Sequence, residues 1–353
     1  MENKETLCAV VVTYNRKYLL LECLEALRKQ TKPLDAIYLI DNFSTDNTPE
    51  LLKENGYINE LPPENLNKPW EKEFAIVNLL DGNVIKLFYV RMNENAGGAG
   101  GFHEGVKRGY ERGYDWLWLM DDDAEPKEDA LEILEPFLKM KNIVALSNLI
   151  VGTDNKIQYG HHQWRYLCGT QKKLTEILSF NDLKIKDFIE INFSSFAGFV
   201  ISKAAINKVG YPMKELFIHD DDFEYSLRVN KIGKIILVPK SIIYHKNNSS
   251  NELNIVIKKF LSINYEIIPL TSFYYLIINY YGFRNLIYIK KKYCGVIQAL
   301  IAGIKVTLKQ IVGIILFDDN KFKRVHITLS ALLDGLFGNF DNQKPKKILK
   351  MKD

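Results

Sequence analysis

Apolar runs alternate with helical patterns over the first two thirds of the chain. The runs are aliphatic and β-branched, which is typical of strands that a parallel sheet buries on both faces. They span residues 7–12, 36–40, 86–91, 116–120 and 143–150. Between them, segments such as 17–29 carry apolar residues at helical spacing. This alternation predicts an α/β fold with a mostly parallel, Rossmann-like sheet and helices on both of its faces.

Some regions depart from the alternation. Residues 54–82 contain three prolines and are predicted to form an insertion or a long loop. Residues 152–186 fit no clear pattern, although His161 and His162 there could shape an acceptor site. Two further strands are predicted, at 193–201 and 235–238.

After about residue 250 the composition shifts to long Ile, Leu, Tyr and Lys stretches with helical spacing. We therefore predict an α/β domain over residues 1–250 and a mainly helical region over 251–353. One helical stripe is apolar and consists of Val296, Leu300, Ile304, Leu308, Ile311 and Ile315. It could pack on the α/β domain or on a second subunit of a homo-oligomer. The alternative is a peripheral contact with the inner face of a membrane.

Composition and charge narrow the classes of partner. The chain has 353 residues, of which 47% are hydrophobic and 25% charged, as in ordinary globular proteins. The formal net charge of +4 is too small to indicate nucleic acid. Basic residues gather at 290–292 and 344–352, where they could hold the protein against anionic lipid.

The four cysteines lack the spacing of a metal site. Cys8 and Cys23 fall in a predicted strand and helix, which favours free buried thiols over a disulfide. The first residues lack the basic and apolar regions of a signal peptide, so a cytoplasmic, reducing setting is expected. The most apolar stretch, 294–317, is interrupted by Lys305 and Lys309, which argues against a membrane-spanning helix.

Polar clusters follow four of the predicted strands. They are Thr13–Arg16, Asp41–Ser44, Asn95–Gly101 and Asp121–Asp123. The carboxyl ends of parallel strands meet at one edge of a sheet, where open α/β sheets bind nucleotides. The glycines of the third cluster permit close approach to a phosphate, or else form a flexible turn. Asp41 could accept hydrogen bonds from a ribose or a base, or stabilise a turn.

The three consecutive carboxylates Asp121, Asp122 and Asp123 repel one another unless a cation lies among them. Mg²⁺ and Mn²⁺ prefer oxygen ligands and commonly bridge one or two carboxylates to phosphates. The triplet therefore predicts a site for a metal and a diphosphate. A solvated acidic turn is the alternative.

A second acidic cluster, at residues 219–225, begins a predicted helix. The helix dipole stabilises carboxylates at this end of a helix, which is one reason for their presence. One of them could also act as a general base toward an acceptor hydroxyl. His245, which follows an apolar run, could complete a metal site, although a lone histidine more often has a structural role.

Taken together, these motifs resemble the family 2 glycosyltransferases, which are inverting enzymes of the GT-A fold, over residues 7–246. The segments that carry the resemblance are Val12–Arg16, Ile40–Asp46, Asn95–Gly98, Asp121–Asp123 and Asp221–Asp222. The finer pattern of residues 97–102, 121–126 and 217–225 is most similar to bacterial galactofuranosyltransferases and rhamnosyltransferase-like relatives.

The resemblance implies a role for each site residue. Contacts to the donor nucleotide would come from Thr13, Asn15, Arg16, Asp41, Asn95, Gly97, Asp121 and Asp122. A divalent cation, Mn²⁺ or Mg²⁺, would be bound by Asp121, Asp123 and His245. Asp222 would be the catalytic base, and Asp221 beside it would hold sugar or acceptor hydroxyls.

The implied reaction transfers galactofuranose from UDP-galactofuranose to a hydroxyl of a glycan or of a polyprenyl-diphosphate-linked acceptor, in bacterial cell-surface polysaccharide synthesis. Transfer of rhamnose from dTDP-rhamnose is the alternative. A sugar nucleotidyltransferase or a non-catalytic sugar-binding module would account for fewer of the motifs. The chain departs from several relatives at residues 217–220, because it lacks a tryptophan just before the acidic pair.

Overall fold

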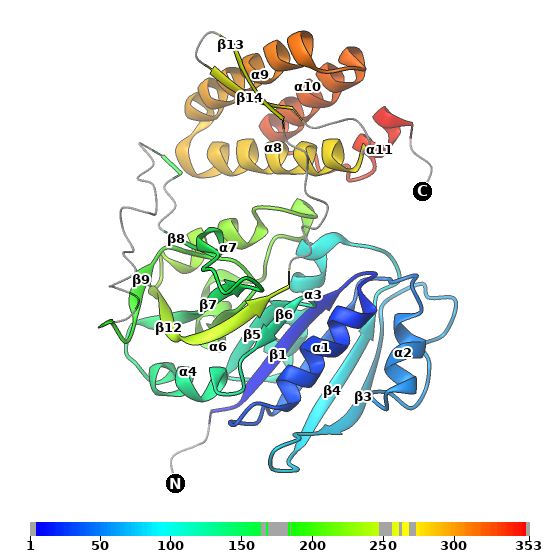
Figure 1. Cartoon of the computed structure of the whole chain (residues 1–353), viewed down its shortest axis with the longest axis vertical. Helices are drawn as coiled ribbons and strands as arrows, with labels where there is room; N and C mark the ends of the chain where they lie inside the picture. The colour runs from blue at the N-terminus through cyan, green and yellow to red at the C-terminus, as the bar shows by residue number, and fades with distance from the viewer. Residues whose placement is uncertain are drawn as a thin grey trace. The chain divides into compact units, whose positions relative to one another are not determined.

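The computed structural model describes residues 5–163, 167–168, 183, 185–246, 256–260, 263–267 and 273–350. These residues form two compact units (Figure 1). The first unit contains most of the described residues up to 246. The second contains residues 167–168 and 215–220 together with the described residues from 256 onward.

A ten-stranded sheet forms the centre of the first unit, in the order β3-β4-β2-β1-β5-β11-β7-β12-β6, with β9 paired to β12. The strands are β1 Leu7–Thr13, β2 Ala36–Asp41, β3 Trp70–Val77, β4 Val84–Arg91, β5 Trp116–Asp121, β6 Ala124–Pro126, β7 Ile143–Gly152, β9 Ile189–Ile191, β11 Phe199–Ser202 and β12 Lys234–His245. The four neighbours β4, β2, β1 and β5 are mutually parallel, and so are β7 and β12. The predicted α/β sheet is therefore confirmed, with antiparallel strands added around its parallel part.

Helices cover both faces of this sheet (Figure 1). Alternate residues of β1 point to opposite faces, as strand geometry requires. Ala9 and Val11 pack in one core with α1 (Lys17–Arg28) and α4 (Ala130–Leu138). Val10 and Val12 pack in the other core, with three helices. These are α3 Gly97–Arg112, α6 Lys203–Val209 and α7 Asp221–Val229. Both faces of the central strands are thus buried, which explains their unbroken apolar sequences.

The glycines of α3 allow this helix to lie directly on the sheet. A Cβ atom at Gly101, Gly105 or Gly109 would come within 3.0 Å of side chains on β1 or β5. These glycines recur every four residues and so share one helix face. Part of the glycine-rich sequence is therefore explained by helix-to-sheet packing.

Two sequence predictions were wrong in detail. The predicted insertion at 54–82 contains β3, an antiparallel edge strand on β4 whose Phe74 and Ile76 alternate inward. The predicted strand at 193–201 is two strands, because the chain turns at Gly198 with a φ of +135°. Its first half, β10 (Phe193–Ser194), pairs with β8 (His162–Gln163) in a separate sheet.

The second unit is mainly helical, as predicted. It contains α8 (Phe273–Cys294), α9 (Val296–Phe317), α10 (Lys321–Phe337), α11 (Lys344–Leu349) and a hairpin of β13 (Val256–Phe260) and β14 (Ile263–Ile267). Its core combines apolar residues of α8 and α10, among them Tyr280, Ile287, Ile327 and Ala331.

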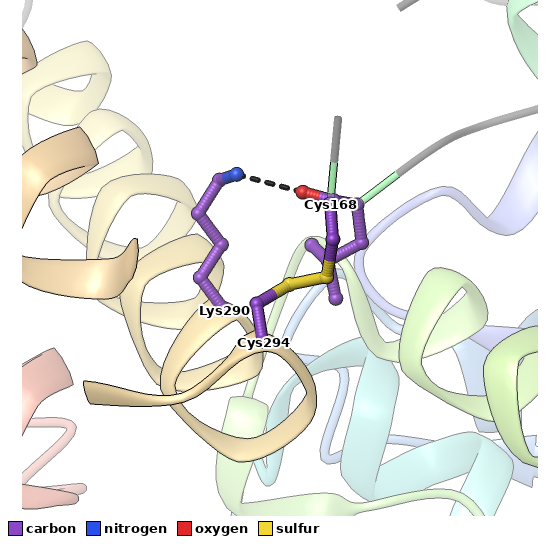
Figure 2. Close-up of a disulfide and its surroundings, with 4 residues drawn as sticks. Cys168, Lys290 and Cys294 are labelled. Carbon is purple, nitrogen blue, oxygen red and sulfur yellow. Dashed lines mark hydrogen bonds between the residues drawn. A yellow bond between two sulfur atoms is a disulfide. The ribbon is translucent and has the colours of Figure 1, made fainter. Parts of the chain in front are cut away.

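The cysteines fall into two classes. Cys8 and Cys23 are free and buried, which confirms the prediction for them. Cys168 and Cys294 form a disulfide within the second unit, where Lys290 Nζ also donates to the carbonyl of Leu167 at 2.8 Å (Figure 2). Disulfides are rare in a reducing cytoplasm, so the redox state of the pair is a direct test of the expected compartment.

One helix in the described part of the chain, α9, is long and apolar enough to cross a membrane by length and composition. Its most apolar window has a mean hydropathy of 1.9 and is 17% buried. Lys305 and Lys309 interrupt this stretch, which spoke against a spanning helix, but the high average hydropathy of the window outweighs the two lysines. A single helix of this kind is only a weak indication of a membrane span.

Candidate functional site

The strand register brings three of the predicted polar clusters to neighbouring positions. Val12 pairs with Asp121 across β1 and β5, and Thr13 pairs with Asp41 across β1 and β2. On the next strand Asp41 pairs with Arg91. All of these strands are parallel, so their carboxyl ends form one edge, where open α/β sheets bind ligands.

The last residue of β1, Thr13, and Arg16 in the loop after it hold two members of the aspartate triplet. Thr13 Oγ1 donates to Asp122 Oδ2 at 2.7 Å. Arg16 Nη1 donates to Asp122 Oδ1 at 3.2 Å and to Asp123 Oδ2 at 2.7 Å. Both carboxylates are buried, whereas the Arg16 side chain is 50% exposed. Arg16 therefore lies between buried acidic groups and solvent.

His245 reaches the triplet through strand pairing. It lies opposite Ala124 in the antiparallel pair of β12 and β6, one residue after Asp123. Its Nε2 is 3.2 Å from Asp123 Oδ1, and its Nδ1 is 3.0 Å from Gln158 Oε1. The ring of His161 lies 4.7 Å away, centroid to centroid. The structure thus places the predicted metal ligands Asp123 and His245 side by side.

The three carboxyl groups titrate differently. Burial, followed by the neighbouring carboxylates, raises the pKa of Asp121 to about 7. Burial also raises the pKa of Asp122 to about 7, although Arg16 opposes the shift. Burial acts in the same direction on Asp123, but contacts with His245 and Arg16 outweigh it and lower the pKa of Asp123. Burial and the neighbouring carboxylates therefore oppose the ionisation of Asp121 and Asp122.

The chemistry of these residues suits a divalent cation. Carboxylates and imidazole are ligands for Mn²⁺, and carboxylates for Mg²⁺. Asp123 Oδ1 is buried beside His245, and no described residue makes a geometric hydrogen bond to it, so it has a lone pair to offer. Among the described residues, however, no three acidic, histidine or cysteine side chains already surround one metal position. These side chains are of the types that bind a divalent metal, and in the structure Asp123 forms ion pairs with Arg16 and His245.

Asp41 is fully buried and already engaged. Its carboxylate accepts hydrogen bonds from Tyr89 Oη at 2.7 Å, from Arg91 Nη1 at 2.6 Å and from the Ser44 amide at 2.8 Å. A carboxylate offers about four acceptor positions, and here three are filled from within the protein. The expected contact of Asp41 with a nucleotide stays a prediction, beside a structural role that the geometry shows.

The predicted nucleotide contacts Asn15, Asn95 and Gly97 belong to loops that bind one another. Asn15 Oδ1 accepts from the Thr45 amide at 2.6 Å. Asn42 Nδ2 donates to Asn95 Oδ1 at 3.1 Å and to the carbonyl of Gly97 at 2.9 Å. Gly97 begins α3 with a φ of +73°, which favours glycine. These bonds fix the loops at the sheet edge.

The second acidic cluster lies at the start of α7. Asp221 is buried and Asp222 is half-buried, and Asp222 Oδ1 accepts from the Phe223 amide at 2.7 Å. Both carboxylates lie in the first turn, where the helix dipole favours negative charge.

A chain of contacts links α7 to the triplet. Ser226 Oγ donates to the carbonyl of Ser194 at 3.3 Å. The next residue, Ser195, has its Oγ 2.8 Å from His161 Nδ1. His161 then contacts His245, the partner of Asp123. Burial, followed by the charge of His245, lowers the pKa of His161 to about 4, so its ring is neutral.

Gln158 and Ser195 were not predicted from the sequence, and His161 was predicted only as part of an acceptor site. No spacing signal connects these residues, because β8, β10 and β12 bring them together from separate parts of the chain. His162, the neighbour of His161, is buried with both ring nitrogens lacking a hydrogen-bond partner in the described structure.

Comparison with known proteins agrees with this geometry. The sequence model of the family described as glycosyl transferase family 2 matches residues 8–59 and 75–210, more than half of the chain. The galactofuranosyltransferase GlfT1 of Mycolicibacterium smegmatis is 26% identical over 234 residues, which are 66% of this chain and 68% of that protein. GlfT1 of Mycobacterium tuberculosis H37Rv is 24% identical over 230 residues, 65% of this chain and 66% of that protein.

The fold is that of GT-A glycosyltransferases. The crystal structure of GalNAc-T7 with UDP, GalNAc and Mn²⁺ superposes with a TM-score of 0.53 at 15% sequence identity. The match covers 98% of this chain but only 58% of that protein. With the family match over more than half of its length, this chain belongs to glycosyl transferase family 2.

Proposed function

We propose that the protein is an inverting, metal-dependent glycosyltransferase that transfers galactofuranose from UDP-galactofuranose. One observation carries the proposal: an aspartate triplet lies at the carboxyl edge of the parallel strands, with Asp122 and Asp123 buried and held by Arg16 and His245. The names of the GlfT1 relatives support galactofuranose as the sugar. The proposed acceptor is a hydroxyl of a glycan or of a polyprenyl-diphosphate-linked oligosaccharide.

The donor would lie along the edge formed by Thr13, Asn15, Arg16 and the loops after β2 and β4. Asp121, Asp123 and His245 would hold the cation, which when bound offsets charge on the leaving diphosphate. Arg16 adds a guanidinium suited to phosphate oxygens.

Asp222 would accept the proton of the attacking hydroxyl. As its oxygen bonds to the anomeric carbon, the bond from that carbon to the diphosphate oxygen breaks. One displacement of this kind inverts the anomeric configuration and needs no covalent enzyme intermediate. Asp221, next in the chain, would hold sugar or acceptor hydroxyls.

The decisive variant is Asp222→Asn. Transfer from UDP-galactofuranose should be lost, while the thermal shift produced by UDP with Mn²⁺ is retained, because only the base is changed. Ser226→Ala, on the same helix, serves as a control for local damage to α7. Retained turnover in Asp222→Asn would rule out Asp222 as the base. Turnover with dTDP-rhamnose and not with UDP-galactofuranose would move the assignment to rhamnosyl transfer.

A lipid-linked acceptor would suit the exposed face of α9. Five large apolar residues at a spacing of three, four or seven form an exposed apolar stripe on α9, which shares Ile304, Leu308 and Ile315 with the stripe predicted from the sequence. They are Ile297 (73% exposed), Ile301 (58%), Ile304 (52%), Leu308 (59%) and Ile315 (54%). Residues 290–317 contain five lysines and no acidic residue. Charge of one sign beside an apolar stripe favours an anionic membrane surface over pairing with a second copy.

Flotation with vesicles tests the membrane contact. The protein should float with anionic vesicles at low salt, and Ile304→Glu should weaken this. Gln298→Glu adds the same charge beside the stripe and should weaken it less. No flotation of the unchanged protein, or a dimer in solution that Ile304→Glu dissociates, would count against the membrane surface.

A further inference from the structure

The segment that leads into α7 has an unusual backbone. Phe217, His219 and Asp220 adopt φ angles of +66°, +68° and +60°. Left-handed backbone is unfavourable for residues with a Cβ, most of all for a bulky one such as phenylalanine. Three such residues within four positions persist only where their surroundings impose the conformation.

A tight turn lies at the start of this segment. The amide of Ile218 donates to the carbonyl of Leu216 at 2.8 Å, across Phe217. A bond between residues two apart, with a positive φ between them, is a γ-turn of the rarer and more strained form. The backbone is therefore bent sharply just before the acidic pair.

Asn285 on α8 holds the bend. Its Nδ2 lies 2.9 Å from the carbonyl of Leu216, 2.9 Å from that of Ile218 and 2.8 Å from that of His219. One amide group thus faces three carbonyls that an extended chain would point in different directions. Asn285 is fully buried, so water does not compete for these bonds.

Arg284 reinforces the same contact. Its Nη2 donates to the carbonyl of Leu216 at 3.0 Å and more weakly to that of Glu215 at 3.4 Å. Its Nε donates to Asn285 Oδ1 at 3.0 Å, which orients that amide. We call Arg284 and Asn285 the carbonyl clasp.

The clasp contains a charge that simple packing would not require. Arg284 is fully buried, and burial lowers its pKa. Its guanidinium also lies 5.1 Å from the ring centroid of Tyr281 and 5.0 Å from that of Phe340, and Nη1 donates to Asn342 Oδ1. Its hydrogen bonds thus go to neutral oxygens, an expensive arrangement for a buried cation. Apolar residues would fill the same space at lower cost.

The segment that the carbonyl clasp holds leads directly into α7. Asp220 is followed directly by Asp221 and Asp222, the first residues of α7. The direction in which the chain enters α7 is set by the bend before it. The position of a side chain in the first helical turn depends on that direction.

We propose that Arg284 and Asn285 are positioning residues, which fix the entry to α7 and thereby aim Asp221 and Asp222 at the reacting groups. This inference rests on the proposed function of Asp222. A small displacement of a catalytic group lowers the rate of the chemical step more than it lowers binding of the donor. The clasp should therefore affect kcat and spare the donor site.

Asn285→Leu tests the proposal, because it keeps the branched shape of the side chain and removes the NH₂ group that faces the three carbonyls. We expect kcat to fall at least about tenfold, with the Kd for UDP in the presence of Mn²⁺ changed by less than about twofold. Tyr280→Phe is the matched control: it removes a buried hydrogen bond from Tyr280 Oη to Asp334 on the same helix but leaves the segment 215–220 untouched. Its kcat should remain near that of the unchanged protein.

Asn285→Ser, which keeps one hydroxyl donor, serves if Asn285→Leu does not fold, and it should show an intermediate fall in kcat. An unchanged kcat in either folded variant would overturn the proposal, and so would equal losses of kcat and of UDP affinity. Failure of the proposed function looks different, because Asp222→Asn would then retain turnover. If Asp222→Asn is inactive and Asn285→Leu is fully active, the proposed role of the carbonyl clasp is refuted while the proposed function stands.

Discussion

Asp41→Asn distinguishes a structural role of this carboxylate from a nucleotide contact. The substitution keeps the volume but replaces one oxygen by an NH₂ group. That group would face Tyr89 Oη or Arg91 Nη1, which both donate to Asp41 Oδ2. Two donors would then meet, and the Arg91 guanidinium would lose its buried counter-charge.

The burial of the ion pair determines how much stability Asp41→Asn should lose. Asp41 is 0% exposed and the Arg91 side chain is 13% exposed, so the pair is largely removed from water. Removing one partner of a buried ion pair costs about 3–5 kcal/mol, and the residual exposure of Arg91 favours the lower end. A loss of about 3 kcal/mol corresponds to a fall in Tm of roughly 6–12 °C for a domain of this size.

Urea unfolding followed by circular dichroism measures this loss, and Tyr89→Phe is the control. That variant removes one hydrogen bond and leaves the ion pair, so about 1 kcal/mol should be lost. The reasoning is refuted if Asp41→Asn unfolds within about 0.5 kcal/mol of the unchanged protein, the range of surface substitutions. If affinity for UDP then falls as well, Asp41 contacts the nucleotide and the fold does not depend on it.

Three further predictions concern single side chains. His245→Ala should weaken Mn²⁺-dependent binding of UDP at least about tenfold in calorimetry, and unchanged affinity would exclude His245 from the metal site. Gly105→Ala should cost about 1–3 kcal/mol through overpacking against β1, whereas Gly98→Ala, with nothing within 4 Å of its Cβ, should not. Burial lowers the pKa of His162 to about 3, so the folded state binds fewer protons than the unfolded one. The contribution of His162 to stability should be complete above pH 6.5 and fall by about 2 kcal/mol at pH 5. In pH-dependent urea unfolding, His162→Leu should remove this contribution and leave that of His161, whose pKa is also lowered.

The central part of the fold was predictable because its sequence pattern has one physical cause. Strands buried on both faces need unbroken apolar runs, and β1 and β2 have them up to their last residues, Thr13 and Asp41. The edge strand β3 was missed because only its last residues alternate, while the prolines before it suggested a loop. The break between β10 and β11 depends on the backbone at Gly198, which no apolar pattern encodes.

The site was predictable in its residue types and only partly in its contacts. Strand ends in a parallel sheet are neighbours by construction, so Thr13 and Asp121 could be placed together from sequence. His245 required knowledge that β12 pairs with β6, and Gln158 and Ser195 required the loops between strands. Such pairings join residues far apart in the chain, so local spacing does not reveal them.

Asp41 and Asp123 show why residue type alone does not decide function at this edge. Both are buried carboxylates just beyond or at a strand end. Asp41 accepts three hydrogen bonds from protein donors, which makes it a fixed part of the fold. Asp123 Oδ1 is buried 3.2 Å from His245 without the geometry of a hydrogen bond. Because this oxygen is ion-paired with His245 but has no geometric hydrogen bond from any described residue, a cation would gain more at Asp123 than at Asp41. The neighbours of each carboxylate determine which one is available for chemistry.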